Sequence, residues 1–566
     1  MTIRTATHAS QSTQQVAAFV GNLAASVSKN GSGTFDSIDA AGEYASEVIN
    51  RGTNVPADLK AVLDDVSGVK VNFGGVDVPA EALVLKSVLD GVESYKAQHG
   101  EAPAADLVQA ALSQAYSTTN EAKSRLKFDA VSADSGNSDA TSMQPNRAVV
   151  AIMGTLSEGI PVANYLPFDI GSNQANLIIV QHVAGSNLGS FKENDILDSA
   201  QGGSPYLSSS RTIKLDAQGK GTFTAAMVDH ETADASAPAV PLLRGRTIVY
   251  VQGVPAAIEV SSGGATAQLG GTIRMGTTDY SASGTVKPDT GEVAVTFTPA
   301  LPANTVVHAE GFIDLEKQPA LTPLVNVQAL KFALFANPWR AKTSVTIDSA
   351  TQFANEVGIS PETETALAIR NQFANERHYQ VVRQAERLGL WNVGEYKFNW
   401  AVFGQQKTRG QIAQDIVAAT YPLEQKMANL TMDHGITHMY VDEIMASTFL
   451  CCDATVFVPS GVAPRQTIYR LGRLLGKYEV YVNPQARKST DSPDVSKIVC
   501  VGRSTQAGRN PFVLGDAVAP MAVQIATGEN FNRNAGFYAR NFTAVNPHAP
   551  SAMGCAILTV TGLANV

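Results

Sequence analysis

GISPETETALAIRNQFANERHYQVVRQAERLGL, residues 358–390, has the clearest helix pattern in the chain. Ser360 can cap a helix, Pro361 suits the first helical position, and Glu362 lies where an acidic side chain favours the positive end of the helix dipole. Gly389 can end the helix. The range Pro361–Leu388 holds 28 residues, which would make a helix roughly 42 Å long. We therefore expect one helix that is long enough to act as a strut across a domain.

The composition bounds the class of protein. With 566 residues the chain is too long for one hydrophobic core, and we expect three or four compact units. Hydrophobic residues make up 44% of the chain and charged residues 16%, which is typical of an ordered protein with fewer surface charges than usual. The net charge is -9 and no block of Lys and Arg resembles a nucleic-acid-binding arm. Tight binding to nucleic acid is therefore disfavoured.

The cysteines and the hydropathy indicate a cytosolic protein. Cys451 and Cys452 are adjacent and only Cys500 and Cys555 accompany them, which suits neither a disulfide framework nor a CxxC metal site. The N-terminal residues lack a basic region followed by a long apolar run, and no window approaches the roughly 20 apolar residues of a membrane helix. We expect a chain that is neither secreted nor membrane-spanning.

Two segments are expected before the first β-rich region. Residues 1–128 are rich in Ala, Ser and Val, and Leu107 and Ala111 have helical spacing, so we expect a mostly helical N-terminal extra domain. Residues 129–146 are a polar run of Ser, Asp, Asn and Gly without hydrophobic periodicity, which predicts a linker.

The following residues have the pattern of extended chain. Short apolar runs alternate with turns over 147–210, which predicts an extended arm. Strand-like runs over 211–330 predict a small β domain or a two-sided β excursion. Within it, the segment Pro288–Gly291 reads as a tight turn, because its proline presets φ and its glycine tolerates positive φ. The side chains from Val293 onward then alternate as in a half-buried strand.

Mixed helices and strands are expected after the long helix. The spacing of apolar residues predicts helices at 408–430 and 463–475. Three β-rich runs follow: YEVYVNP at 478–484, KIVCVG at 497–502 and CAILTVTG at 555–562.

No catalytic or metal-binding constellation stands out. In DHGITH, His434 and His438 are four residues apart, but Gly435 and the β-branched residues beside it disfavour the helix that would bring them together. Two structural histidines are the simpler interpretation. Asp442 and Glu443 are adjacent and in a strand would face opposite ways. GRLLGK at 472–477 lacks the spacing of a phosphate-binding loop. We expect no catalytic residues, no cofactor and no metal.

GFYARNFTAVNP, residues 536–547, is unusual for a closed core. In an extended strand Phe537 would face one side, while Arg540 would share the other side with Tyr538 and Phe542. A buried guanidinium needs a partner. Two interpretations stay open: an edge strand whose arginine extends to water, or a strand that meets another domain or subunit.

The order of these segments resembles a known family. The strand-like lead into the long helix, AKTSVTIDSATQFANEV followed by residues 358–388, resembles the spine-helix region of tailed-phage major capsid proteins, especially the myovirus T-even-like group. GKYEVYVNP and SKIVCVG look like paired strands late in that family's axial domain. The segment 511–547 resembles its closing part, in which an apolar stretch with proline leads to a Phe, a Gly-Phe, an Arg and a final Asn-Pro.

The resemblance implies a fold and a set of contact residues. The fold would be α+β, of the Hong Kong 97-type capsid class: an N-arm at 147–210, an extended loop at 211–330, a peripheral domain with the spine helix at 331–400, an axial domain at 401–535 and closing peripheral strands at 536–566. Residues implied to make subunit or domain contacts are Phe531, Gly536, Phe537, Arg540, Asn546 and Pro547.

The resemblance also implies a function without catalysis. The chain would be the major capsid protein of a tailed double-stranded DNA phage, made in the bacterial host cytoplasm and found in the virion. Its copies would form the hexamers and pentamers of an icosahedral head that encloses DNA without sequence-specific binding. Portal, scaffold, decoration or cement proteins would be its other partners, and no membrane would be involved. The alternative is another repeating virion part, such as a tail sheath or decoration protein.

Overall fold

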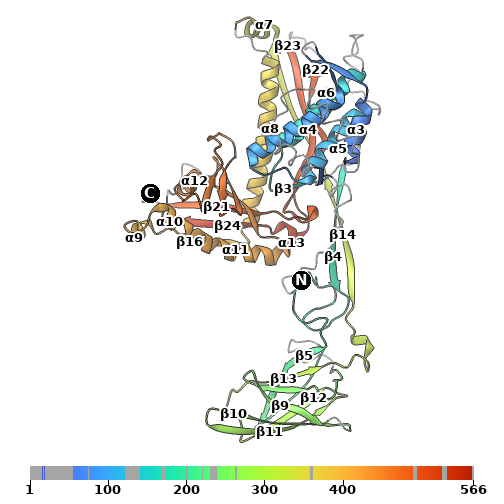
Figure 1. The fold of residues 1–566 in the computed structure, drawn as a ribbon, viewed down its shortest axis with the longest axis vertical. Helices are drawn as coiled ribbons and strands as arrows, with labels where there is room; N and C mark the ends of the chain where they lie inside the picture. The colour runs from blue at the N-terminus through green and yellow to red at the C-terminus, as the bar shows by residue number, and fades with distance from the viewer. Residues whose placement is uncertain are drawn as a thin grey trace. The chain divides into compact units, whose positions relative to one another are not determined.

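The computed structural model divides the chain into two compact units. It describes Val16, Ala18, Phe19 and residues 55–73, 76–120, 140–166, 173–198, 202–219, 221–229, 239–261, 264–356, 361–487, 492, 494–525 and 532–563. One unit consists of Met1–Ile179 with Lys331–Val566, and the other of Val180–Leu330. Helices and β-sheets are both extensive (Figure 1). The α+β class expected from the sequence is therefore confirmed.

Helices dominate the described part of the N-terminal segment. They are α3 (Ala57–Val66), α4 (Ala80–His99), α5 (Ala105–Asn120) and α6 (Ala140–Ser157), and the antiparallel strands β1 (Lys70–Phe73) and β2 (Val76–Pro79) lie between α3 and α4. α4 has buried residues along nearly its whole length, from Ala80 to Tyr95. It ends at Gly100, whose φ of 73° is the left-handed conformation that favours glycine after a helix.

The start of α6 corrects two expected boundaries. Residues 140–146 of the expected linker and the first residues of the expected N-arm at 147–210 are helical, and residues 129–139 lie outside the described residues. The polar residues before Arg147 conceal the start of the helix. Its apolar stripe is nevertheless regular, because Ala148, Ile152 and Leu156 follow one another at intervals of four and are completely buried.

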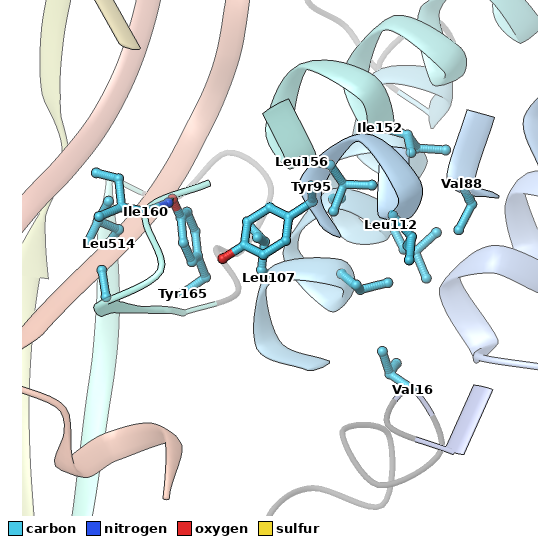
Figure 2. Close-up of a cluster of buried hydrophobic side chains, with 14 of the residues drawn as sticks. Val16, Val88, Tyr95, Leu107, Leu112, Ile152, Leu156, Ile160, Tyr165 and Leu514 are labelled. Atoms are coloured by element: carbon cyan, nitrogen blue, oxygen red, sulfur yellow. The ribbon is translucent and has the colours of Figure 1, made fainter. Parts of the chain in front are cut away.

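The N-terminal helices share one hydrophobic core with the C-terminal half of the chain. The cluster includes Leu107 and Leu156 from the helices, Val381 from the long helix and Leu514 from a C-terminal strand. Figure 2 shows the ring of Tyr95 reaching from α4 toward Tyr165, between the helices and the strands. Both tyrosines are buried. These helices are therefore packed into the first unit rather than resting on its surface.

A four-stranded sheet and the long helix form the next layer. The sheet has the order β15 (Asn337–Thr346), β23 (Asn532–Val545), β22 (Phe512–Ile525) and β3 (Ala163–Tyr165), antiparallel except between β22 and β3. The helix α7 (Ile347–Glu356) follows β15, and α8 spans Pro361–Gly389. Figure 1 shows α8 running beside β22 and β23, and it also contacts the second sheet of this unit. The expected strut is confirmed, while its expected cap Ser360 lies outside the described residues.

A seven-stranded mixed sheet completes the first unit. Its strands, in order across the sheet, are β16 (Val393–Lys397), β24 (Cys555–Thr561), β21 (Val495–Gly502), β17 (Ile436–Val441), β20 (Tyr478–Val482), β19 (Tyr469–Leu474) and β18 (Phe457–Pro459). The short helices and turns around it are α9 (Trp400–Phe403), α10 (Arg409–Gln414), α11 (Ile416–Thr431), α12 (Glu443–Leu450), the 3-10 turn Ala507–Arg509 and α13 (Ala549–Ala552). β16 and β18 are the two edges of this sheet.

Three expectations about this region need correction. The helix expected at 463–475 is wrong, because β19 lies there and pairs with β20. The strands β20 and β21 do not pair with each other, since β17 lies between them. The helix expected at 408–430 is present as α10 and α11, which meet at Asp415.

The second unit is built on a nine-stranded sheet. Its strands, in order across the sheet, are β5 (Ser210–Lys214), β13 (Val307–Phe312), β8 (Ile248–Val251), β9 (Val254–Ser261), β10 (Ala267–Met275), β11 (Thr278–Lys287), β12 (Glu292–Thr298), β7 (Thr222–Ala226) and β6 (Asp216–Gly219). The turn between β11 and β12 is the expected one, because Gly291 has φ 72° and its N–H donates to the carbonyl of Lys287. Val293, Val295 and Phe297 all face the core.

Two further strands form a separate ribbon. β4 (Gln174–Ala184) pairs with β14 (Val325–Phe335), and its end also bridges to Ile196 through Val183; the 3-10 turn Pro319–Leu321 precedes β14. Gln181 of β4 donates a hydrogen bond to Gln328 of β14 over 2.8 Å. β14 is exposed along most of its length. A ribbon of this kind leaves strand edges open to another chain.

Candidate assembly surfaces

The strand that carries the unusual GFYARNF sequence is an inner strand of its sheet. β23 pairs with β15 on one side and with β22 on the other, so the edge-strand interpretation is wrong. Gly536 lies in this ladder, opposite Lys342 and Val523. Phe531, the first of the expected contact residues, lies outside the described residues.

Phe537 fixes the long helix on this sheet. Its ring centroid lies 5.3 Å from that of Phe373 of α8, and the Phe373 ring lies edge-on to Trp339 of β15 at 5.0 Å. Phe373 is only 3% exposed. Aromatic pairs at these separations add to the stability that burial alone gives. Phe537 therefore makes an intramolecular contact between β23 and α8.

Arg540 lies on the opposite face of β23 and keeps part of its surface exposed. On the same face, Phe542 is buried against Leu177 and Val513. The Nε atom of Arg540 is buried and has no hydrogen-bond partner among the described residues. A buried donor of this kind is costly unless another group satisfies it. The buried Nε does not itself show a contact outside the chain, and the contact of Arg540 with another subunit stays a prediction.

Asn546 and Pro547 shape the chain after β23. The side chain of Asn546 is buried, and its Nδ2 donates to the carbonyls of Gly508 and Asn510, each over 2.8 Å. Its Oδ1 accepts the N–H of His548. Pro547 is exposed. These two residues lead into α13, which precedes the last strand β24.

A buried ion pair, which the sequence did not reveal, joins α8 to the four-stranded sheet. Arg377 of α8 is 2% exposed, and its Nη2 lies 2.8 Å from Oδ1 of Asp516 of β22. Its Nε donates to Oγ1 of Thr543 of β23 over 3.1 Å, and its guanidinium lies 5.9 Å from the ring centroid of Tyr165 of β3. One arginine thereby ties the helix to three strands of the sheet.

A second ion pair joins α8 to α6. Nε of Arg370 donates to Oε1 of Glu158 over 3.1 Å. Burial raises the pKa of Glu158, and the charge of Arg370 opposes this shift.

The buried position of Arg377, unlike its partner, could have been predicted from the sequence. Phe373, Arg377 and Val381 are spaced by four along α8, and all three face the core.

The two edges of the seven-stranded sheet expose large apolar side chains. At the β16 edge, Leu390, Trp391 and Val393 are 69%, 68% and 48% exposed. We call these three residues the β16-edge patch. They follow the end of α8 directly, and Nζ of Lys426 of α11 donates to the carbonyl of Trp391. Exposed apolar groups gathered in one place are typical of a surface that meets a partner.

The opposite edge of the sheet also exposes apolar side chains. At the β18 edge, Val458 and Leu475 are 56% and 42% exposed, and we call them the β18-edge patch. They are close together, because β18 pairs with β19 and the N–H of Leu475 donates to the carbonyl of Val456. The sheet thus presents two different apolar patches, one at each open edge.

The ribbon and β15 are also open. Val325, Val327 and Phe335 of β14 are exposed, as is Ile178 of β4. In the part of the chain that the structure describes, β15 is an edge strand that pairs only with β23. A second chain could add to either by strand pairing.

The two histidines considered for metal binding have different surroundings. Nδ1 of His438 lies 2.8 Å from Oγ1 of Thr437. Both ring nitrogens of His434 are buried without a hydrogen-bond partner among the described residues, and its Nδ1 lies 3.5 Å from a carboxylate oxygen of Asp433. Asp442 is the N-cap of α12 and its Oδ1 accepts the N–H of Met445, so Asp442 and Glu443 lie at the start of a helix and not within a strand. Within the described ranges, no group of three or more His, Cys, Asp and Glu side chains could hold a metal ion. No described helix is long and apolar enough to cross a membrane.

No family model matches the sequence, and no curated protein matches it. Among solved structures, the chain is similar to the jumbo bacteriophage PhiKZ capsid, with 9% sequence identity, a TM-score of 0.36 and coverage of 71% of this chain and 91% of that chain. It is similar to the capsid of Myoviridae phage XM1, with 8% identity, a TM-score of 0.27 and coverage of 57% and 90%. The SrpI encapsulin complex from Synechococcus elongatus matches with 8% identity, a TM-score of 0.23 and coverage of 41% and 77%. Two of these three solved structures are phage capsids and the third is an encapsulin complex.

Proposed function

We propose that this chain is the major capsid protein of a tailed double-stranded DNA bacteriophage. Its copies assemble into the hexamers and pentamers of an icosahedral head, of the Hong Kong 97-type fold, and the protein catalyses no reaction. It is made in the cytoplasm of the bacterial host and is found in the virion. Its main partner is a second copy of itself, and portal, scaffold, decoration or cement proteins complete the particle.

The observation that carries this proposal is the pair of apolar patches at the two edges of the seven-stranded sheet. A closed ring needs head-to-tail contacts, in which one surface of a subunit meets a different surface of the next. The β16-edge patch and the β18-edge patch are two such surfaces on one rigid sheet. The open strand β15 and the exposed ribbon of β4 and β14 offer further places for overlap between subunits.

The charge of the chain fits an enclosing role. The net charge of -9 gives the protein the same sign as DNA. A wall of like charge repels packed DNA and lets it slide instead of binding it. We propose that the head holds the genome in this way, without sequence-specific contacts.

The experiment uses one charged variant for each edge. Trp391→Glu places a charge in the β16-edge patch, and Val458→Glu places one in the β18-edge patch. Each variant alone is expected to lose assembly, measured as sedimentation velocity of the purified full-length protein. An equimolar mixture is expected to form heterodimers, because one intact β16 edge can still meet one intact β18 edge, but no larger ring can close.

The mixture separates the possible outcomes. Heterodimers in the mixture support head-to-tail contacts between the two edges. Assembly by either single variant at the level of the unmodified protein would overturn the proposed contact, as would a mixture that stays monomeric. Leu207→Glu is the matched control, since it adds the same charge at an exposed apolar residue outside this sheet, and it is expected to assemble normally.

A further inference from the structure

A buried cluster of histidines and tyrosines lies where the N-terminal helices meet the seven-stranded sheet. We call it the histidine–tyrosine cluster. Its members come from α4, α8, β17 and β20, and they are Tyr95, His99, His378, His438, Tyr440 and Tyr481. None of them belongs to either edge patch. The cluster is therefore separate from the surfaces proposed for assembly.

The contacts run from α4 to the sheet without interruption. Nδ1 of His99 lies 3.1 Å from the hydroxyl of Tyr481. The ring of His438 stacks on that of Tyr481 at a centroid distance of 6.0 Å, and the ring of Tyr440 also stacks on it, at 5.5 Å. Because Tyr95 packs against His99 at 4.4 Å, the last turns of α4 are held through these rings.

A further contact joins the cluster to the long helix α8. Nε2 of His378 lies 3.1 Å from the hydroxyl of Tyr440. Tyr440, Tyr481 and His438 are 2%, 2% and 5% exposed. The hydroxyl groups of the two tyrosines are thus each hydrogen-bonded to a histidine, one on α4 and one on α8.

Nothing that faces the cluster in the described part of the chain would compensate a positive charge. The charged and titratable groups around it come from β19, β20, β24, α5 and the turns after α4 and β21: Arg470, Arg473, Glu479, Cys555, Asp106, Glu101 and Arg503. Each of the acids is already bound to an arginine. Glu479 pairs with Arg470 and Arg473, Glu101 pairs with Arg473, and Asp106 pairs with Arg503.

The histidines are therefore held neutral. Burial, with a smaller contribution from the nearby arginines Arg503 and Arg473, lowers the pKa of His438 to about 3. Burial also lowers the pKa of His99 and of His378. His438 is only 5% exposed, so a charged imidazole there would meet aromatic rings and arginines instead of water or a carboxylate, which is costly.

We propose that the histidine–tyrosine cluster is an acid-sensitive latch, which holds α4 on the seven-stranded sheet while its imidazoles are neutral and releases α4 when they are protonated. The latch acts within one subunit and does not depend on assembly. Its release would separate the N-terminal helices from β17 and β20 while the nine-stranded sheet of the second unit stays folded.

The pH range follows from the shift of His438. Its pKa in the folded protein lies below its ordinary value of 6.5, so the neutral form favours the closed latch. The stabilisation is fully present above about pH 6.5 and is lost as the pH falls from there toward about 3. At pH 4.5, protonation of one such histidine raises the equilibrium constant for release of α4 about 100-fold above its value at neutral pH.

The test is hydrogen exchange of the full-length protein at pH 7.5 and pH 4.5, corrected for the intrinsic exchange rates. The amides of α4 from Val88 to His99 are expected to lose protection by about 100-fold or more at pH 4.5. The amides of β11 and β12 serve as the internal reference and are expected to keep theirs. Equal protection of α4 at the two pH values would overturn the proposal, and so would an equal loss in α4 and in the reference strands.

Two variants assign the effect to the cluster. His438→Phe keeps an aromatic ring against Tyr481 but cannot be protonated, and it is expected to reduce the loss of protection at pH 4.5 by about tenfold or more. His548→Phe is the matched control, because burial lowers the pKa of His548 to about 4 as well, yet its ring bonds to Ser551 away from α4. It should respond to pH as the unmodified protein does.

The variants also define the contrary result. If His438→Phe loses protection in α4 as fully as the unmodified protein, or if His548→Phe removes the response, the cluster is not the latch. Should His438→Phe already lack protection of α4 at pH 7.5, His438→Gln is measured in its place and judged by the same outcomes.

Discussion

Individual buried charges in the first unit are held by specific partners. Arg377 is bound to Asp516 and to Thr543, and Glu479, which is 2% exposed, lies between Arg470 and Arg473. A buried ion pair need not stabilise a protein more than apolar residues would, but the removal of one partner leaves an uncompensated charge. The long helix α8 is therefore sensitive to loss of a single charge at its centre.

We expect Arg377→Met to lower the free energy of unfolding of the first unit by about 3–5 kcal/mol, because Asp516 stays buried without its partner. The double variant Arg377→Met/Asp516→Leu should lose less than Arg377→Met alone, since no charge is left unpaired. Urea unfolding followed by tryptophan fluorescence measures both values.

Arg383→Ala is the control for this pair, because Arg383 is an exposed arginine of the same helix. It should change the free energy of unfolding by no more than about 0.5 kcal/mol. A double variant that is at least as unstable as Arg377→Met would contradict the account of the ion pair.

Sequence reasoning could identify the position of Arg377 but not its partner. The spacing of Phe373, Arg377 and Val381 places the arginine on the buried stripe of α8. Asp516 comes from a strand far along the chain, and no periodicity connects the two. The same holds for Phe537, which the family resemblance implies to be a contact residue, since its partner Phe373 is evident only in the structure.

At the scale of helices and strands, prediction succeeded where local signals agreed. α8 begins with a proline and has a long apolar stripe, and the structure has it at Pro361–Gly389. Prediction failed at β19, because Leu471 and Leu474 have helical spacing although this segment pairs with β20 as a strand. Cross-strand contacts of Arg470 and Arg473 with Glu479 then stabilise the strand. Tertiary pairing thus outweighs local preference in this segment.

The turn glycines of the nine-stranded sheet allow a test at this scale. Gly291 and Gly276 both have positive φ, of 72° and 64°. A Cβ atom at Gly291 would also collide with the carbonyl oxygen of Val240, whereas a Cβ atom at Gly276 would meet nothing within 4 Å. We expect Gly276→Ala to cost about 1 kcal/mol and Gly291→Ala at least about 2 kcal/mol.

Hydrogen exchange of β11 and β12 in the full-length chain measures this difference, since each 1.4 kcal/mol is about a tenfold change in the opening equilibrium. The amides should exchange faster in both variants and fastest in Gly291→Ala. Equal effects of the two substitutions would show that the contact with Val240 is unimportant.

At the scale of the whole molecule, the sequence indicated the class of fold but not the surfaces. The composition suggested helices at the N-terminus, yet it could not show that Leu107 and Leu156 share a core with Val381 and Leu514. The edge patches could not be predicted from the sequence either. Trp391 and Val458 are ordinary apolar residues in the sequence, and they become a pair of surfaces only because β16 and β18 are the outer strands of one sheet. Strand order depends on contacts between distant segments, which local patterns do not encode.

The central claim is that copies of this chain assemble with one another into a closed shell. Electron microscopy of negatively stained, purified full-length protein is the experiment that tests it. We expect closed shells, or rings of six and five subunits, built from this chain alone. Helical tubes would instead identify a tail-sheath type of protein, and a protein that stays monomeric at every concentration and salt condition tested would contradict the claim.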